Sequence, residues 1–161
     1  MSKADELNKQ LETGASDPDD VSGTYVGIKL SPESILKFNR MIEESGIEDA
    51  IKPHDYHVTL FYSEKKTLTD FEVKSEVEYL VTGNSVQMLG KAAVVILDPR
   101  SMLTLRHETI KIEYNAEHSF ENFLPHISLK YDPTEDDLKK FKSIFEKTDF
   151  TLTGEYSEPL K

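Results

Sequence analysis

The chain has 161 residues, which is enough for one domain with a single core or for two small lobes that share one. It contains no cysteine, which excludes a disulfide framework, a thiolate nucleophile and a cysteine-ligated metal, and its net charge of −11 disfavours binding to a long DNA or RNA strand. The N-terminus lacks the basic and apolar stretches of a signal peptide, and no apolar run is long enough to span a membrane. We therefore expect a cytoplasmic protein without a membrane partner.

The first 22 residues are acidic and poor in apolar side chains. Six carboxylates stand against two lysines, and Gly14 and Pro18 further disfavour regular structure. We expect a disordered acidic tail over residues 1–22 and one folded domain over residues 23–161.

The first half of that domain has the predicted order strand, helix, strands. Residues 24–30 are rich in β-favouring side chains and predict a strand. A serine N-cap, a proline in the first turn and a glycine stop predict a helix over residues 31–46. Residues 57–62 predict the next strand. Charges at alternate positions within residues 67–82 predict one or two half-exposed strands.

The second half is predicted to consist mainly of strands, over residues 92–97, 102–105, 109–114, 126–131 and 150–153. One helix begins after Thr134, a favourable N-cap that is followed by three acidic residues. Strands and helices in this order predict an α+β fold, in which two helices cover mostly antiparallel sheets.

A short pattern occurs twice in the chain, as His57–Leu60 and as His126–Leu129. Each copy is a histidine, an apolar residue, a hydroxyl residue and a leucine, and the histidines lie 69 residues apart. Alternate side chains of a strand share a face, so His57 and Thr59 are expected to point one way while their two apolar neighbours enter the core. The same holds for the second copy.

These residue types suit the cleavage of a phosphodiester. The reaction needs a base for the attacking oxygen and an acid for the leaving oxygen, and histidine can serve as either near neutral pH. A hydroxyl two residues further along can donate a hydrogen bond to a phosphate oxygen. The pattern therefore predicts His57 and His126 as acid and base, with Thr59 and Ser128 binding the phosphate, and it calls for no metal or other cofactor.

The other three histidines are interpreted as structural or solvent-exposed. Pro53 and the strand that follows disfavour the helical geometry that would let His54 and His57 share a metal, and His107 and His118 lie in polar stretches that predict a surface position. Three basic residues are weaker candidates for contact with an anionic ligand: Lys29, Arg106 and Lys130.

The paired His-x-Thr/Ser-x motifs resemble those of the two-histidine phosphoesterase superfamily. Their spacing, the small size, the opening Tyr25–Lys29 and the ending Leu152–Tyr156 resemble phage anti-CBASS nucleases in particular, which degrade the cyclic oligonucleotides that bacterial immune systems use as alarm signals. The resemblance covers Thr24 to the C-terminus. It implies a two-lobed fold around a central groove, a small cyclic oligonucleotide substrate, and action in the cytoplasm of the host.

The resemblance also implies a mechanism. One histidine deprotonates a ribose 2′-hydroxyl, which attacks the adjacent 3′–5′ phosphodiester. The other histidine protonates the departing 5′ oxygen, and the product is a 2′,3′-cyclic phosphate that water can open. Which histidine begins as the base is left open.

Three residues are candidates for contacts with a nucleobase. Tyr25 and Tyr156 offer rings for stacking, and the Glu155 carboxylate can accept hydrogen bonds from an exocyclic amine. A half-buried strand tyrosine and a solvated terminal charge are the alternative interpretations of Tyr25 and Glu155.

Other functions stay open at this point. The same chemistry suits a phosphodiesterase for 2′,3′-cyclic ends or for 2′–5′ linked oligonucleotides. A non-catalytic sponge for cyclic nucleotides and an acidic adaptor for a basic protein are alternatives outside enzymology, and the oligomeric state is left open as well.

Overall fold

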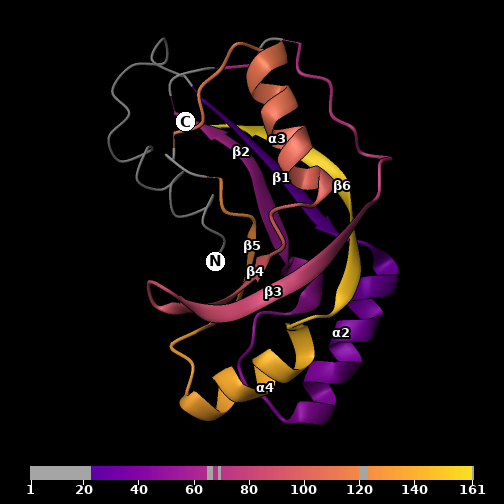
Figure 1. Cartoon of the computed structure of the whole chain (residues 1–161), viewed down its shortest axis with the longest axis vertical. Coiled ribbons are helices and arrows are strands. Elements are labelled where there is room, and N and C mark those ends of the chain that lie inside the picture. Colours follow the sequence, from indigo (N-terminus) through magenta and orange to yellow (C-terminus); the bar gives the residue numbers. More distant parts are fainter. Residues whose placement is uncertain (1–22, 65–66, 69, 120–122, 161) are drawn as a thin grey trace.

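The computed structural model describes residues 23–64, 67–68, 70–119 and 123–160, so the predicted tail over residues 1–22 lies outside the described residues. Its strands are β1 (Thr24–Leu30), β2 (His57–Ser63), β3 (Tyr79–Leu89), β4 (Ala92–Leu97), β5 (His126–Tyr131) and β6 (Asp149–Pro159). Its helices are α2 (Pro32–Ser45), the short 3-10 helix η2 (Pro53–Asp55), α3 (Met102–Glu113) and α4 (Glu135–Phe145). The fold is α+β, as predicted (Figure 1).

The strands form one sheet in the order β2-β1-β6-β3-β4-β5, and every neighbouring pair is antiparallel. The long strand β3 belongs to both halves, because residues 79–82 pair with β6 and residues 83–89 pair with β4. Gly83 stands where the partner changes, and a Cβ atom there would collide with the backbone carbonyl of Phe145. Glycine thus allows α4 to approach the bend that joins the two halves of the sheet.

A single hydrophobic cluster contains side chains from all three α-helices in the described part of the chain. Phe38 of α2, Leu103 of α3 and Phe145 of α4 are all fully buried in it. The helices therefore cover the same face of the sheet, α3 at one end and α2 with α4 at the other (Figure 1). The opposite face is left for the two histidine motifs.

Local signals predict α2 and α4 well. The Ser31 hydroxyl accepts a hydrogen bond from the Ser34 backbone, and α2 ends at Gly46 with a left-handed φ of 77°. Thr134 and Asp137 form a capping box at the start of α4. These caps need only neighbouring residues, and both predictions are confirmed.

The prediction of strands over residues 102–105 and 109–114 is wrong, because α3 contains the first segment and all of the second except its C-cap residue, Tyr114. The buried residues of α3 have helical spacing, at positions i, i+3, i+4 and i+7, but two of them are polar: Leu103, Arg106, His107 and Ile110. Because two of the four inner positions are polar, the spacing of the apolar side chains alone does not reveal a helical period.

The prediction of strands over residues 67–82 is also largely wrong. A strand begins only at Tyr79 and then runs on to Leu89, and residues 72–78 are all exposed. Neither side of that segment packs against the core, so its alternating charges do not mark the two faces of a strand.

Among the residues that the structure describes, no helix is both long and apolar enough to cross a membrane.

Candidate active site

Both histidine motifs lie at the start of a strand, as predicted. Along β2, His57 and Thr59 are half-buried, while Val58 and Leu60 are completely buried. Along β5, the same alternation recurs, with Ile127 and Leu129 completely buried in the main core. The histidine and hydroxyl side chains of each motif therefore share the face of the sheet that the helices leave open.

The two motifs also share an irregularity. Gly27 pairs with Thr59 but Val26 with Phe61, so Leu60 is an extra residue in β2. In β5, Val94 pairs with Ser128 but Ala93 with Lys130, and the extra residue is Leu129. Each hydroxyl residue is thus followed directly by a β-bulge, a device that redirects side chains and is frequent beside active sites.

The curvature of the sheet brings β2 and β5 close to each other although the two strands stand at opposite ends of the strand order. Cα atoms of β2 and β5 lie within 8 Å of each other, and Figure 1 shows the two strands side by side. The segment before β2 is also tied to β5, because the Ile51 N–H donates to the Leu129 carbonyl at 2.8 Å. Residues far apart in sequence are therefore held on adjoining strands.

Each motif histidine is oriented by the carbonyl two residues before it. His57 Nδ1 lies 3.1 Å from the Asp55 carbonyl oxygen, and His126 Nδ1 lies 2.7 Å from the Leu124 carbonyl oxygen. A carbonyl oxygen can only accept, so Nδ1 carries the proton in both rings and Nε2 carries the lone pair of the neutral form. The two rings are therefore oriented in the same way and carry the same tautomer.

Tyr25 contacts the first motif directly. Thr59 Oγ1 donates to the Tyr25 hydroxyl at 3.3 Å, and the Tyr25 ring packs against Tyr156 with 5.9 Å between the ring centres. Burial, with a smaller contribution from Tyr156, raises the pKa of Tyr25 well above its usual value, so its hydroxyl stays protonated. At 1 % exposure the Tyr25 ring is enclosed by protein, and its predicted stacking on a base stays a prediction.

A third bulge, in β6, places Tyr156 on the same face. Gly154 has a left-handed φ of 73°, and the register of β6 against β1 shifts at this point. Thr153 pairs with Lys29 and Tyr156 pairs with Gly27, so the Tyr156 ring covers the bare backbone of that glycine. Lys29 Nζ lies 5.2 Å above the Tyr156 ring, and Lys29 is also the cross-strand partner of His57.

The same bulge turns Glu155 towards the helix-covered face, away from the motifs. Its carboxylate accepts hydrogen bonds from Arg106 Nε and NH2 at 2.8 Å each and from the Lys74 backbone at 2.8 Å. Glu155 is 2 % exposed, so the alternative of a solvated terminal charge is wrong. Contact with a base, which stays a prediction, would require the carboxylate to leave these donors.

The three basic candidates differ in the structure. Arg106 is used by Glu155, and Lys130 donates to Asp137 at 2.8 Å. Lys29 is exposed, and no acidic partner within 4.0 Å is found for it among the described residues. Lys29, next to His57, is therefore the basic side chain best placed to meet an anion.

The expected surface position is wrong for His107 and holds only in part for His118. His107 is 2 % exposed and stacks on Phe123 with 4.0 Å between ring centres, and His118 is half-buried against the edge of His107 at 4.7 Å. His107 Nδ1 lies 2.6 Å from the Leu60 carbonyl oxygen. The sequence predicts strands over most of α3, so it gives no sign of the inner face of this helix or of the contacts that His107 and His118 make there.

Burial of His107 makes stability depend on pH. Desolvation lowers the pKa of His107, so between that pKa and about 6.5 the unfolded chain binds more protons than the folded chain. The free energy of unfolding should therefore fall as the pH drops below about 6.5. Urea titrations at pH 7.5 and 5.5 measure this loss, and it should be smaller in His107→Asn. An equal loss in both proteins would contradict this origin.

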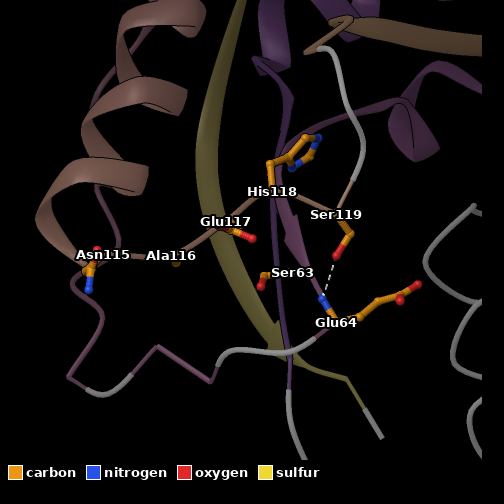
Figure 2. Close-up of a pocket in the computed structure, with 7 residues that line it drawn as sticks. All are labelled: Ser63, Glu64, Asn115, Ala116, Glu117, His118 and Ser119. Carbon is orange, nitrogen blue, oxygen red and sulfur yellow. Dashed lines mark hydrogen bonds between the residues drawn. The ribbon is translucent and has the colours of Figure 1, made fainter.

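A pocket of about 640 Å³ lies at the far end of β2, between Ser63–Glu64 and residues 115–119 (Figure 2). Its lining is polar and includes none of the four motif residues.

Within the described part of the chain, no three histidine or carboxylate side chains gather in a way that could hold a metal ion.

Fold and site together define an α+β protein in which a curved antiparallel sheet carries two matched histidine motifs, on its first and last strands, β2 and β5, which lie close to each other. The chain belongs to the Anti-CBASS protein Acb1 family, whose sequence profile matches residues 22–161. This finding confirms the anti-CBASS family that the motif spacing, the small size and the two ends of the folded region resemble.

Relatives and solved structures agree in coverage. The Anti-CBASS protein Acb1 of Vibrio phage KVP40 is 31% identical over 141 residues, which cover 86% of this chain and 87% of that protein. That of Salmonella phage S16 is 26% identical over 150 residues, 87% of this chain and 90% of the relative. The MHV ns2 PDE domain (TM-score 0.43, covering 87% of this chain and 99% of that one) and E. coli LigT complexed with 3′-AMP (0.41, 87% and 95%) are each 14% identical. The TM-scores are low, and family membership rests on the sequence matches.

Proposed function

We propose that this protein is a metal-independent phosphodiesterase that hydrolyses the 3′–5′ bonds of cyclic di- and trinucleotides in the host cytoplasm and thereby counters CBASS defence. The observation that carries the proposal is the duplicated motif. The two His-x-Thr/Ser-Leu segments, on β2 and β5, have the same side-chain orientation, the same histidine tautomer and a bulge at the same position. Membership of the anti-CBASS family supports the choice of substrate. The net charge of −11 favours a small nucleotide over a long strand.

In the proposed reaction, Nε2 of one neutral histidine takes the proton of a ribose 2′-hydroxyl. The 2′ oxygen then forms a bond to phosphorus as the bond to the 5′ oxygen breaks, and Nε2–H of the other, protonated histidine supplies the proton of the leaving 5′-hydroxyl. This step leaves a 2′,3′-cyclic phosphate, and water opens that ring to complete the hydrolysis. Thr59 and Ser128 donate hydrogen bonds to the non-bridging oxygens, whose charge grows in the transition state. The Nδ1–carbonyl hydrogen bonds keep both rings directed for these transfers.

Residues around the first motif are proposed to bind the rest of the substrate. Lys29 is the cross-strand neighbour of His57 and can attract a phosphate, and Tyr156 beside it offers a half-exposed ring to a base. Tyr25 contacts the Thr59 hydroxyl. That hydroxyl has one proton, so Thr59 donates to the phosphate only when the Tyr25 hydroxyl becomes the donor of their shared hydrogen bond. Contact of Tyr25 or Glu155 with a base is retained as a proposal that requires their present neighbours to shift.

The test is hydrolysis of a panel of cyclic di- and trinucleotides in the presence of chelator, with 2′–5′ linked oligonucleotides and 2′,3′-cyclic phosphates beside them. We expect turnover of the cyclic panel, products bearing 2′,3′-cyclic phosphate and 5′-hydroxyl ends, and a bell-shaped pH–rate profile, because one histidine must be neutral and the other protonated. Loss of activity on chelation would contradict the metal-free reaction. Tight binding without turnover would make the protein a sponge, and turnover of the 2′–5′ or 2′,3′-cyclic compounds alone would reassign the substrate.

A further inference from the structure

Backbone groups on the outer edge of β2 form hydrogen bonds with two histidine side chains and with Ser119. β2 stands first in the strand order, so only β1 pairs with it among the described strands. On the other edge, His107 Nδ1 bonds the Leu60 carbonyl, the Tyr62 N–H donates to His118 Nδ1 at 3.0 Å, and the Ser119 N–H donates to the Tyr62 carbonyl at 2.7 Å. Figure 2 shows the next bond, from the Glu64 N–H to the Ser119 hydroxyl.

The bond to Leu60 has a counterpart in the second motif. Leu60 and Leu129 are the bulge residues that directly follow Thr59 and Ser128, and each carbonyl accepts a hydrogen bond from outside its strand pair. The donor to Leu129 is the Ile51 backbone at 2.8 Å, whereas the donor to Leu60 is the His107 side chain at 2.6 Å. The His107 side chain therefore bonds the bulge carbonyl of the first motif, as the Ile51 backbone N–H bonds that of the second.

His107 is held firmly enough to act in this way. Its ring stacks on Phe123 with an angle of 7° between the planes and meets His118 edge-on. A carbonyl cannot donate, so Nδ1 of His107 must carry a proton, and the bond persists in the neutral ring. Since His107 lies on the helix-covered face, it does not compete with substrate for the open face.

We infer that His107 is a positioning residue for the reaction: its Nδ1–H holds the bulge carbonyl of Leu60 and so fixes the direction in which the Thr59 hydroxyl points. The inference rests on the proposed function, because it gives His107 a role only through Thr59. A small displacement of a group that binds the transition state can lower a rate by about 100-fold.

Two variants separate the hydrogen bond from the packing. His107→Phe keeps a ring against Phe123 but has no donor for the Leu60 carbonyl, and His107→Asn keeps a donor near the Nδ1 position without the ring. We expect His107→Phe to lower kcat for cyclic oligonucleotides by about 10- to 100-fold with little change in KM, and His107→Asn to recover part of that loss. A folded His107→Phe with the kcat of wild type would overturn the inference, as would His107→Asn no better than His107→Phe.

A double variant tests whether His107 acts through Thr59. If it does, His107→Phe should have little further effect in a Thr59→Val background, whereas independent roles would multiply. His54→Phe is the matched control, because His54 is an exposed histidine of η2 whose Nε2 lies 3.4 Å from the Asp55 carboxylate, and it should leave kcat unchanged.

The ¹³C shift of the Leu60 carbonyl and the methyl shift of Thr59 test the same claim without turnover. Both should move in His107→Phe and return towards wild type in His107→Asn, while the Leu129 carbonyl, bonded by Ile51, should not move. If these shifts move but wild type cleaves nothing, the proposed function fails and the contact stands. If wild type is active and the shifts of Leu60 and Thr59 stay in place, the inference about His107 fails alone.

Discussion

Replacing either His57 or His126 with alanine is expected to lower kcat for cyclic oligonucleotides by about 10²- to 10⁴-fold, the usual contribution of a general acid or base. Each ring is proposed to handle a proton that the other cannot, so both losses should be large. The double variant should be little worse than either single one, because groups that act as a unit are not additive. Steady-state kinetics in chelator, with product analysis, is the measurement.

The fold should survive these replacements. Both side chains are half-buried on the open face of the sheet and outside the main core cluster, so the urea midpoint should stay close to that of wild type. His54→Ala serves as the control, because it makes the same histidine-to-alanine change at an exposed position three residues before His57. Near-wild-type rates for His57→Ala or His126→Ala would disprove the paired mechanism.

Replacing Arg106 with methionine is expected to destabilise the protein by about 3–5 kcal/mol, because it strands a buried carboxylate without its partner. The Glu155 side chain is completely buried and holds Arg106 through two hydrogen bonds of 2.8 Å. Urea denaturation at pH 7.5 measures the loss. Arg100→Met is the matched control, since Arg100 binds Asp98 through a similar paired contact but at the surface, and its effect should be far smaller.

The companion variant is Arg106→Met with Glu155→Gln. The amide removes the buried charge while keeping an oxygen for the Lys74 N–H, so the double variant should recover much of the stability lost by Arg106→Met. The single variant Glu155→Gln also bears on the predicted contact with a base. If it weakens binding of a cyclic dinucleotide at unchanged stability, Glu155 serves the ligand; if stability alone falls, it serves the fold.

The errors of the sequence analysis concern elements whose inner face is polar or missing. α3 buries Arg106 and His107 among its inward residues, so hydrophobicity alone gave no helical period. Residues 72–78 bury no face, so their period of two predicted a strand that does not form. In both cases the deciding contacts come from other parts of the chain: Glu155 lies 49 residues beyond Arg106, and Leu60 lies 47 residues before His107.

Neighbouring residues are enough to predict the caps of α2 and α4 and the orientation of the side chains in both histidine motifs. Caps depend on hydrogen bonds between neighbours, and the two faces of a strand alternate with every residue, so neither needs a distant contact. The folded chain was needed to show that β2 lies close to β5, that a bulge follows each hydroxyl residue, and that Arg106 and His107 bond buried partners. Those features arise from sheet curvature, strand register and the burial of polar groups, which join residues far apart in the chain and leave no local pattern to read.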